Sequence, residues 1–512
     1  MSDARALTTS DKLFYSIGQL AESMKNLSLA VFILFYYNSL LGMNAMLAGL
    51  SMLIALIIDS ATDPLIGAVS DRWRSRFGRR HFFMYLAVVP FLFTFYLLFA
   101  PPASLLPGRD APLADHLPLF AWLTGFGIAA RVVLTFFTVP HLALGAELSS
   151  DYRTRTVVAS WREAVTAIGS LLVYGIAFGW FFAGPRGQLE TEAYPAFALT
   201  IAVIMSAAML VSALGTHHLI PYLHQPAQRV RMSAAAILIE TAHAFRNRNF
   251  RWYFTGAVMI YMVIGIDTAL LLYVNTYIWE ISGRPLLWVS LSLFVGYFLG
   301  APLTPRLHSR FDKRPVLMGG TTWFAVFQML PVIVWLLGGM PAEGTAALVM
   351  TLSVMRIVQG IGTVQSRTSG SSMLADVADE YELQSGKRQE GVFFGAQLVA
   401  YKATSGLGKF VSGILLSLIA WPTSQQIAAE GVPHEKLVWL ALMYGPFVGV
   451  LAVLSVWCYS RYQLDAQTHR EIVEQLALRR RGIARQSAES VPDGRDAENE
   501  GQSLTGLAPR SS

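Results

Sequence analysis

The stretch IIDSATDPLIGAVSDRWRSRFGRR, residues 57–80, begins in an apolar segment and ends in a basic loop. Two acids, Asp59 and Asp63, stand four residues apart inside the apolar part. In a helix this spacing places both side chains on one face, with Cβ atoms about 5–6 Å apart. A charge inside a bilayer is costly, so it usually faces a cavity or a partner. The stretch therefore predicts a membrane-spanning helix with a functional pair of acids.

The composition of the whole chain is that of a membrane protein. Of its 512 residues, 54% are hydrophobic and 14% are charged, whereas soluble domains carry roughly 25% charged residues. The single cysteine, Cys458, excludes an internal disulfide and a cysteine-based zinc site. A span needs about 20 apolar residues. The segments that meet this length are about 13–40, 45–70, 81–100, 117–145, 157–183, 195–222, 252–280, 285–305, 315–339, 345–368, 392–420 and 436–460.

Arginine and lysine gather in the loops on one side of these spans. The basic loops are residues 72–80, 153–155, 229–251, 306–314 and 387–388. Because basic loops stay inside the cell, we expect both termini in the cytoplasm. The same bias explains the net charge of +6, so no nucleic-acid partner is expected.

The longest loop between spans divides the chain near its middle. We expect a six-helix bundle over 1–223, a cytoplasmic loop over 224–250, a second six-helix bundle over 251–462, and a cytoplasmic tail over 463–512 that is disordered after about 486. Six spans plus six, with inverted repeats inside each half, is the major facilitator plan, in which the solute binds between the halves. The sequence thus predicts an all-α membrane protein with twelve transmembrane helices in two six-helix bundles.

The loop over residues 67–80 resembles the cytoplasmic loop motif of major facilitators. Gly67 would permit close helix approach, Asp71 would pair with cations or cap a helix, and the arginines would contact lipid headgroups. The alternative is an ordinary basic loop. The second half has a weaker echo, RFDKR, at residues 310–314. The gating residues that we expect are Gly67, Asp71, Arg79, Arg80, Asp376 and Arg388.

The two acids of the span over 45–70 cannot both stay ionised in a low-dielectric interior unless a cation joins them. A proton or a metal ion would satisfy the pair. A lysine or arginine from another helix is the alternative, since other spans supply such residues. The charged residues of those spans are Lys25, Arg131, Arg162, Arg356, Arg367, Lys402 and Lys409, with Glu22, Glu163, Asp267 and Glu280.

Two longer patterns carry a family resemblance. DSATDPLIG at 59–67 with FGRR at 77–80, and SMLADVADEYELQSGKRQEG at 372–391 followed by Lys402, resemble the glycoside–pentoside–hexuronide:cation symporters. The resemblance covers roughly residues 12–460. It implies a site for sodium or a proton and makes Lys402 the residue that couples cation and solute. The implied cation ligands are Asp59, Thr62, Asp63 and Thr135.

The solute site departs from the family pattern. Two family acids are replaced by Ser23 and Thr138, although a shift of one residue would put Glu22 at the first position, and two tryptophans are replaced by Leu142 and Arg367. The solute-binding residues that the resemblance implies are Ser23, Arg131, Thr138, Arg162, Arg367, Gln397 and Lys402. Because arginine binds carboxylate or phosphate through two parallel hydrogen bonds, this set favours an anionic solute. In the alternative, a neutral cavity, the arginines pair with Glu22, Glu163, Asp376 and the acid pair.

These features predict a secondary active transporter of the cell inner membrane and not an enzyme. We expect symport of a sugar or sugar-derived small solute, neutral or anionic, driven by sodium or protons. The alternative is transport of a lysophospholipid or similar amphiphile, which would need an apolar cleft open to the bilayer. We expect a monomer without cofactors, surrounded by membrane lipid.

Overall fold

The first half of the chain is built from helices alone. The computed structural model describes residues 7–108, 111–148, 152–222, 244–386, 390–422 and 424–489, and every regular element in these ranges is a helix. The elements of the first half are α1 (Thr9–Ile17), α2 (Gln19–Val31), η1 (Phe35–Leu40), α3 (Ala45–Arg72), α4 (His81–Leu98), η2 (Ala103–Leu105), η3 (Leu113–His116), α5 (Leu117–Glu147), α6 (Tyr152–Ile176), η4 (Ala177–Phe181), η5 (Gly187–Leu189), α7 (Ala193–His217) and η6 (Ile220–Tyr222).

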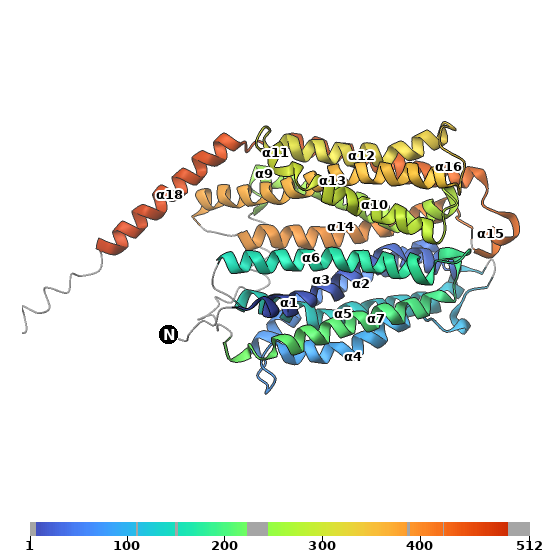
Figure 1. The fold of residues 1–512 in the computed structure, drawn as a ribbon, viewed down its shortest axis with the longest axis horizontal. Helices are drawn as coiled ribbons and strands as arrows, with labels where there is room; N and C mark the ends of the chain where they lie inside the picture. Colours follow the sequence, from blue (N-terminus) through green and yellow to red (C-terminus); the bar gives the residue numbers. More distant parts are fainter. Residues whose placement is uncertain are drawn as a thin grey trace, which may run out of the picture.

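The second half repeats this plan and adds a helix at its end. Its elements are α9 (Arg248–Tyr273), η7 (Val274–Ile278), α10 (Arg284–Gly300), α11 (Leu303–His308), α12 (Lys313–Leu336), α13 (Ala346–Ser385), α14 (Glu390–Leu418), α15 (Ser424–Glu430), α16 (His434–Leu442), η8 (Met443–Phe447), α17 (Val448–Ser460) and α18 (Ala466–Glu489). The long helices run side by side along one axis (Figure 1). Helices α1, α11 and α18 lie at one end of the bundle, which we call the termini end, and α15 lies at the opposite end.

The predicted all-α membrane fold is confirmed. In the described ranges, nine helices are long and apolar enough to cross a membrane. The three further predicted spans differ for local reasons. The first is divided between α1 and α2 at Gly18, α10 has only 17 residues, and α14 carries Lys402 and Lys409 within its length.

One helix continues well past the predicted span. The tenth span was expected to end at residue 368, but α13 continues to Ser385 and stops where Gly386 adopts a left-handed φ of 72°. Residues 369–385 are polar, so the apolar part of α13 ends before the helix does. Asp376 therefore lies in the polar continuation of this helix and not in a loop.

The two halves meet most closely where α3 packs against α14. A Cβ atom on Gly49 would lie 3.0 Å from Phe410 Cα, so a larger residue there would push the helices apart. Polar contacts between the halves gather at the opposite end, where Ser39 bonds Tyr277 at 2.5 Å and Gln188 donates to Thr276 at 2.7 Å. These contacts close the bundle at that end.

The tail helix α18 docks onto the termini end before it projects away from the bundle (Figure 1). Ile472 and Leu476 are buried in a cluster that includes Met373 and Val377 of α13. The His469 ring lies 3.1 Å from an Asp379 oxygen and 3.4 Å from one of Asp376. Most of the expected central loop, the residue Arg388 and the end of the tail lie outside the described residues.

Candidate functional site

The two predicted acids of α3 face one basic side chain of α14. Lys402 Nζ lies 2.7 Å from Asp63 Oδ2 and 3.6 Å from Asp59 Oδ2. On α5, the Thr135 hydroxyl lies 3.1 Å from Asp59 Oδ1 and 3.2 Å from Asp63 Oδ1. The lysine is 339 residues distant in sequence from Asp63. Its position places a charge from the second half against an acid pair of the first.

The two acids differ in solvent exposure. Asp59 is 3% exposed and lies 3.8 Å from Arg131 Nη1, whereas the Asp63 side chain is 29% exposed. In this conformation, basic side chains therefore pair with the two acids. This is the arrangement expected from the sequence as the alternative to a bound proton or metal ion. Thr62 is not directed at the pair, because its hydroxyl donates to the Asp59 carbonyl oxygen at 3.0 Å.

The predicted solute residues form two groups. In the first half, Arg162 on α6 donates to Gln19 Oε1 at 3.0 Å, and Gln19 donates to Glu22 at 2.9 Å. Glu22 lies within electrostatic range of Lys402, the lysine that faces the acid pair. Thr138 lies one helical turn beyond Thr135 on α5.

Other predicted solute residues have structural neighbours. Ser23 packs on α6, where a Cβ on Gly169 would overlap its hydroxyl. Gln397 donates to the Tyr253 and Tyr261 hydroxyls of α9 at 2.8 and 2.9 Å. The second group lies in the second half of the chain and includes Arg367 on α13. Arg367 interacts electrostatically with Tyr297 and Tyr401 of its own half and with Glu163 of the first half.

The predicted gating arginines pair inside the first half. Arg79 and Arg80 lie 2.8 and 3.0 Å from the same oxygen of Glu147, at the end of α5. Arg80 is 2% exposed and also pairs with Asp71. Sequence reasoning missed Glu147, because it stands just outside the apolar run; an acid directly after a span and opposite a basic loop was the available signal.

The second half has a matching arrangement at the same end. Lys313, at the start of α12, donates to both oxygens of Asp376 at 2.7 Å. The weaker copy of the loop motif at residues 310–314 therefore supplies an ion pair, through Lys313. The expected role of Gly67 is not seen in this conformation, since a Cβ there would lie 3.5 Å from Val139, an ordinary contact.

We expect Glu147→Gln to slow turnover by about tenfold with little effect on solute affinity. The change leaves the buried Arg80 with Asp71 as its acidic partner, and a shift of about 1.4 kcal/mol between conformations changes their ratio tenfold. Turnover in vesicles and solute binding to purified protein would be measured, with the exposed Glu435→Gln as the control. Normal turnover with weakened binding would contradict this role.

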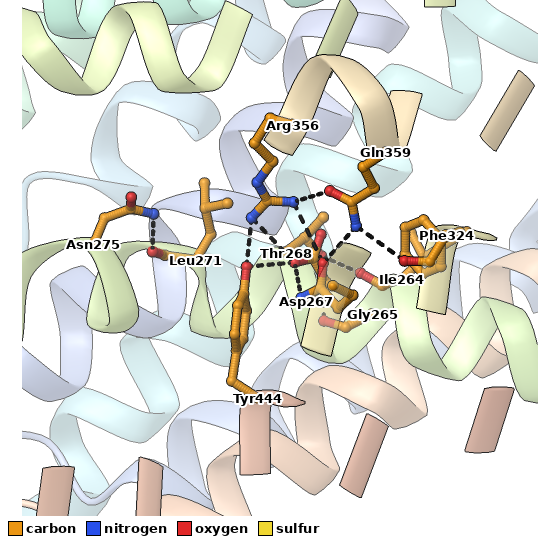
Figure 2. A network of polar contacts seen from close by, with 11 residues as sticks. Ile264, Gly265, Asp267, Thr268, Leu271, Asn275, Phe324, Arg356, Gln359 and Tyr444 are labelled. Atoms are coloured by element: carbon orange, nitrogen blue, oxygen red, sulfur yellow. Dashed lines mark hydrogen bonds and ion pairs between the residues drawn. The ribbon is translucent and has the colours of Figure 1, made fainter. Parts of the chain in front are cut away.

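A second buried polar network lies inside the second half (Figure 2). Asp267 Oδ1 accepts from Gln328 at 2.8 Å and from the Tyr444 hydroxyl at 2.6 Å, and lies 3.7 Å from Arg356 Nη2. Arg356 also donates to Gln359 at 2.9 Å. The adjoining cavity of about 20 Å³ has room for a single water and not for a sugar. We therefore treat this network as structural.

His141 packs between aromatic rings and does not join a metal site. Its Nε2 lies 2.7 Å from the Tyr15 carbonyl oxygen, and its ring stacks on Tyr15 at 4.4 Å. No group of three or more histidine, cysteine or acidic side chains suited to a metal ion occurs in the described part of the chain.

Comparison with known proteins agrees with this architecture. The family model described as MFS/sugar transport protein matches residues 14–466. A relative from Escherichia coli, "Putative glycoside/cation symporter YagG", is 23% identical over 95% of this chain and 98% of its own. The "Putative sulfoquinovose importer" of Salmonella typhimurium is 23% identical over 93% and 94%.

A solved structure supports the fold independently. A mutant form of the nucleoside transporter NupG superposes with a TM-score of 0.61 at 13% identity, over 89% of this chain and all of the other. The helices, their order and the family match point to one conclusion. This chain belongs to the MFS/sugar transport protein family of the major facilitators, as its symporter-like motifs indicated, and it is a membrane transporter and not an enzyme.

Proposed function

We propose that the protein is a symporter that couples a sodium ion or a proton to the uptake of an anionic sugar derivative. The observation that carries the proposal is the placement of Lys402 Nζ, 2.7 and 3.6 Å from the two acids of α3. A basic side chain of one half thereby occupies the position that a coupling cation would take in the other half.

Competition between Lys402 and the cation would provide the coupling. Two carboxylates and the Thr135 hydroxyl offer oxygen ligands to sodium, and one carboxylate is enough for a proton. A cation that binds the acids weakens their attraction for Lys402. The released ammonium group is then free to bind an anionic solute in the cavity between the halves.

The solute's charge is inferred from the basic residues at the expected solute site. Arg162 is held by the neutral side chain of Gln19, and Arg367 has two tyrosines and Glu163 as its electrostatic partners. The relative named as a sulfoquinovose importer supports the proposal, because sulfoquinovose carries a sulfonate group. Contacts between the halves gather at the end opposite the termini, which supports a cytoplasm-facing conformation if both termini are cytoplasmic.

Competition binding would test the solute's charge. Glucuronate is expected to bind more tightly than glucose, and Arg162→Gln or Arg367→Gln should reduce glucuronate affinity by about tenfold or more, since a charge-assisted hydrogen bond is worth about 1.5–3 kcal/mol. The control is Arg186→Gln, because the Arg186 side chain is 79% exposed and pairs with nearby Glu190. Tighter binding of the neutral sugar, unaffected by either variant, would refute the anionic solute.

A further inference from the structure

Basic side chains outnumber acids around the α3 acid pair. Lys25 on α2, Arg131 on α5 and Lys402 on α14 act electrostatically on Asp59, and Lys402 also pairs with Asp63. Lys409 on α14 lies within electrostatic range of Lys25 and Arg131, which makes four basic side chains in this region. Glu22 also acts on Lys25, so three acids stand against four basic side chains, and the set carries an excess of one positive charge when all four are protonated. An uncompensated charge is unfavourable in a low-dielectric interior.

The excess charge is concentrated on two lysines. Lys25 is 5% exposed and Lys409 is 8% exposed. Neither ammonium group makes a hydrogen bond or ion pair within the described ranges. The charges that act on Lys409 come from Arg131 and Lys25, both of its own sign.

Helix geometry places these groups together, beyond the acid pair. Lys409 follows Lys402 by seven residues, which puts it on the same face of α14 about 10 Å nearer the opposite end. That face packs on α3, where a Cβ on Gly49 would lie 3.1 Å from the Lys409 carbonyl oxygen. Arg131 precedes Thr135 by one turn of α5, again toward the opposite end.

An unpartnered hydroxyl marks the same region. Ser28 is fully buried and its Oγ has no hydrogen-bond partner in the described structure. It follows Lys25 by three residues, so the two side chains share a face of α2. The helix face of α2 thus carries a hydroxyl without a partner together with Lys25, and Lys409 lies within electrostatic range of Lys25. Hydroxyl and ammonium groups are the hydrogen-bond donors that suit an anion.

We propose that Lys25, Arg131, Lys409 and Ser28 form a buried anion site between α2, α5 and α14, which adjoins the acid pair through Arg131. Its ligand is a small anion, either inorganic chloride or the carboxylate or sulfonate group of the solute. This inference goes beyond the proposed transport function, and its test measures binding without a gradient. If the test rejects the anion site, the proposed transport function is unaffected, and the reverse also holds.

Thermal unfolding of the purified full-length protein would test the site. Chloride is titrated into a low-salt buffer that contains no carboxylate or sulfonate, and a saturable rise in Tm is expected. Lys409→Met and Lys25→Met should each abolish this rise. Both variants should be at least as stable as the parent without chloride, because each removes a buried amine that has no hydrogen-bond partner in the described structure, so loss of folding does not confuse the result.

Lys436→Met is the matched control, since this lysine bonds the Ala420 carbonyl at the opposite end, outside the site. It should keep the chloride effect. Absence of a saturable effect in the parent, or an equal effect in Lys409→Met, would overturn the proposal. Repeating the titration with glucuronate present distinguishes the two sources of the anion. If the chloride concentration that gives half of the rise in Tm increases, glucuronate competes and the site binds the solute's carboxylate. If this concentration is unchanged, the site binds the inorganic anion.

Discussion

Asp63→Asn is expected to abolish accumulation of the solute against its gradient while leaving solute exchange intact. The variant removes the carboxylate that lies 2.7 Å from Lys402, so a coupling cation and the lysine no longer compete for it. Each tenfold of ion gradient stores about 1.4 kcal/mol. If one ion is coupled to each solute molecule, a tenfold ion concentration ratio should therefore support a solute concentration inside the vesicles about tenfold higher than outside in the parent. In the variant, the solute concentrations inside and outside should stay about equal.

The experiment uses vesicles with an imposed sodium or proton gradient and compares net accumulation with counterflow. Asp63 suits the test better than Asp59, because it is partly exposed and its replacement should not unfold the protein. Asp312→Asn, which changes an exposed acid of the loop before α12, is the control. Accumulation by Asp63→Asn equal to that of the control would show that the coupling ion binds elsewhere.

The fold could be predicted because bilayer thickness imposes a length on every apolar segment. That signal fails where a helix leaves the membrane. Residues 369–385 of α13 are too polar to be part of a span, yet no residue there stops a helix before Gly386. Hydropathy gives the position of the bilayer, whereas the end of a helix depends on local backbone geometry.

The candidate site could be predicted in part. The spacing of Asp59 and Asp63 fixes their shared helical face, and the structure brings Thr135 to both of them. The sequence could not choose which of several basic residues reaches the pair, because that depends on how α14 packs against α3. Nor could it show that the Thr62 hydroxyl would bond its own helix.

The same limit explains the network around Asp267. Its members come from α9, α12, α13 and η8, and only two of them, Asp267 and Arg356, were noticeable as charges inside spans. Glutamine and tyrosine are common in apolar helices and gave no signal. The convergence of Gln328 and Tyr444 on the Asp267 carboxylate is a property of the packed bundle. Figure 2 shows Tyr444 and Arg356 directed at this carboxylate.

Asp267→Ala should be the most destabilising single change among the residues of this network. Arg356, whose side chain is 16% exposed, would lose its acidic partner, and removal of one partner of a buried pair costs about 3–5 kcal/mol. Glu190→Ala, which breaks the exposed pair with Arg186, should cost at most about 1 kcal/mol. Denaturant unfolding in detergent would measure both free energies.

A double variant separates the lost charge pair from lost packing. Replacing a buried ion pair with apolar residues of similar volume is often neutral or stabilising, so Asp267→Leu combined with Arg356→Met should recover much of the stability that Asp267→Leu loses alone. Recovery would locate the cost in the unpaired guanidinium group. A double variant no more stable than Asp267→Leu would instead mean that the hydrogen bonds from Gln328 and Tyr444 to the carboxylate, and not the charge of Arg356, make Asp267 necessary.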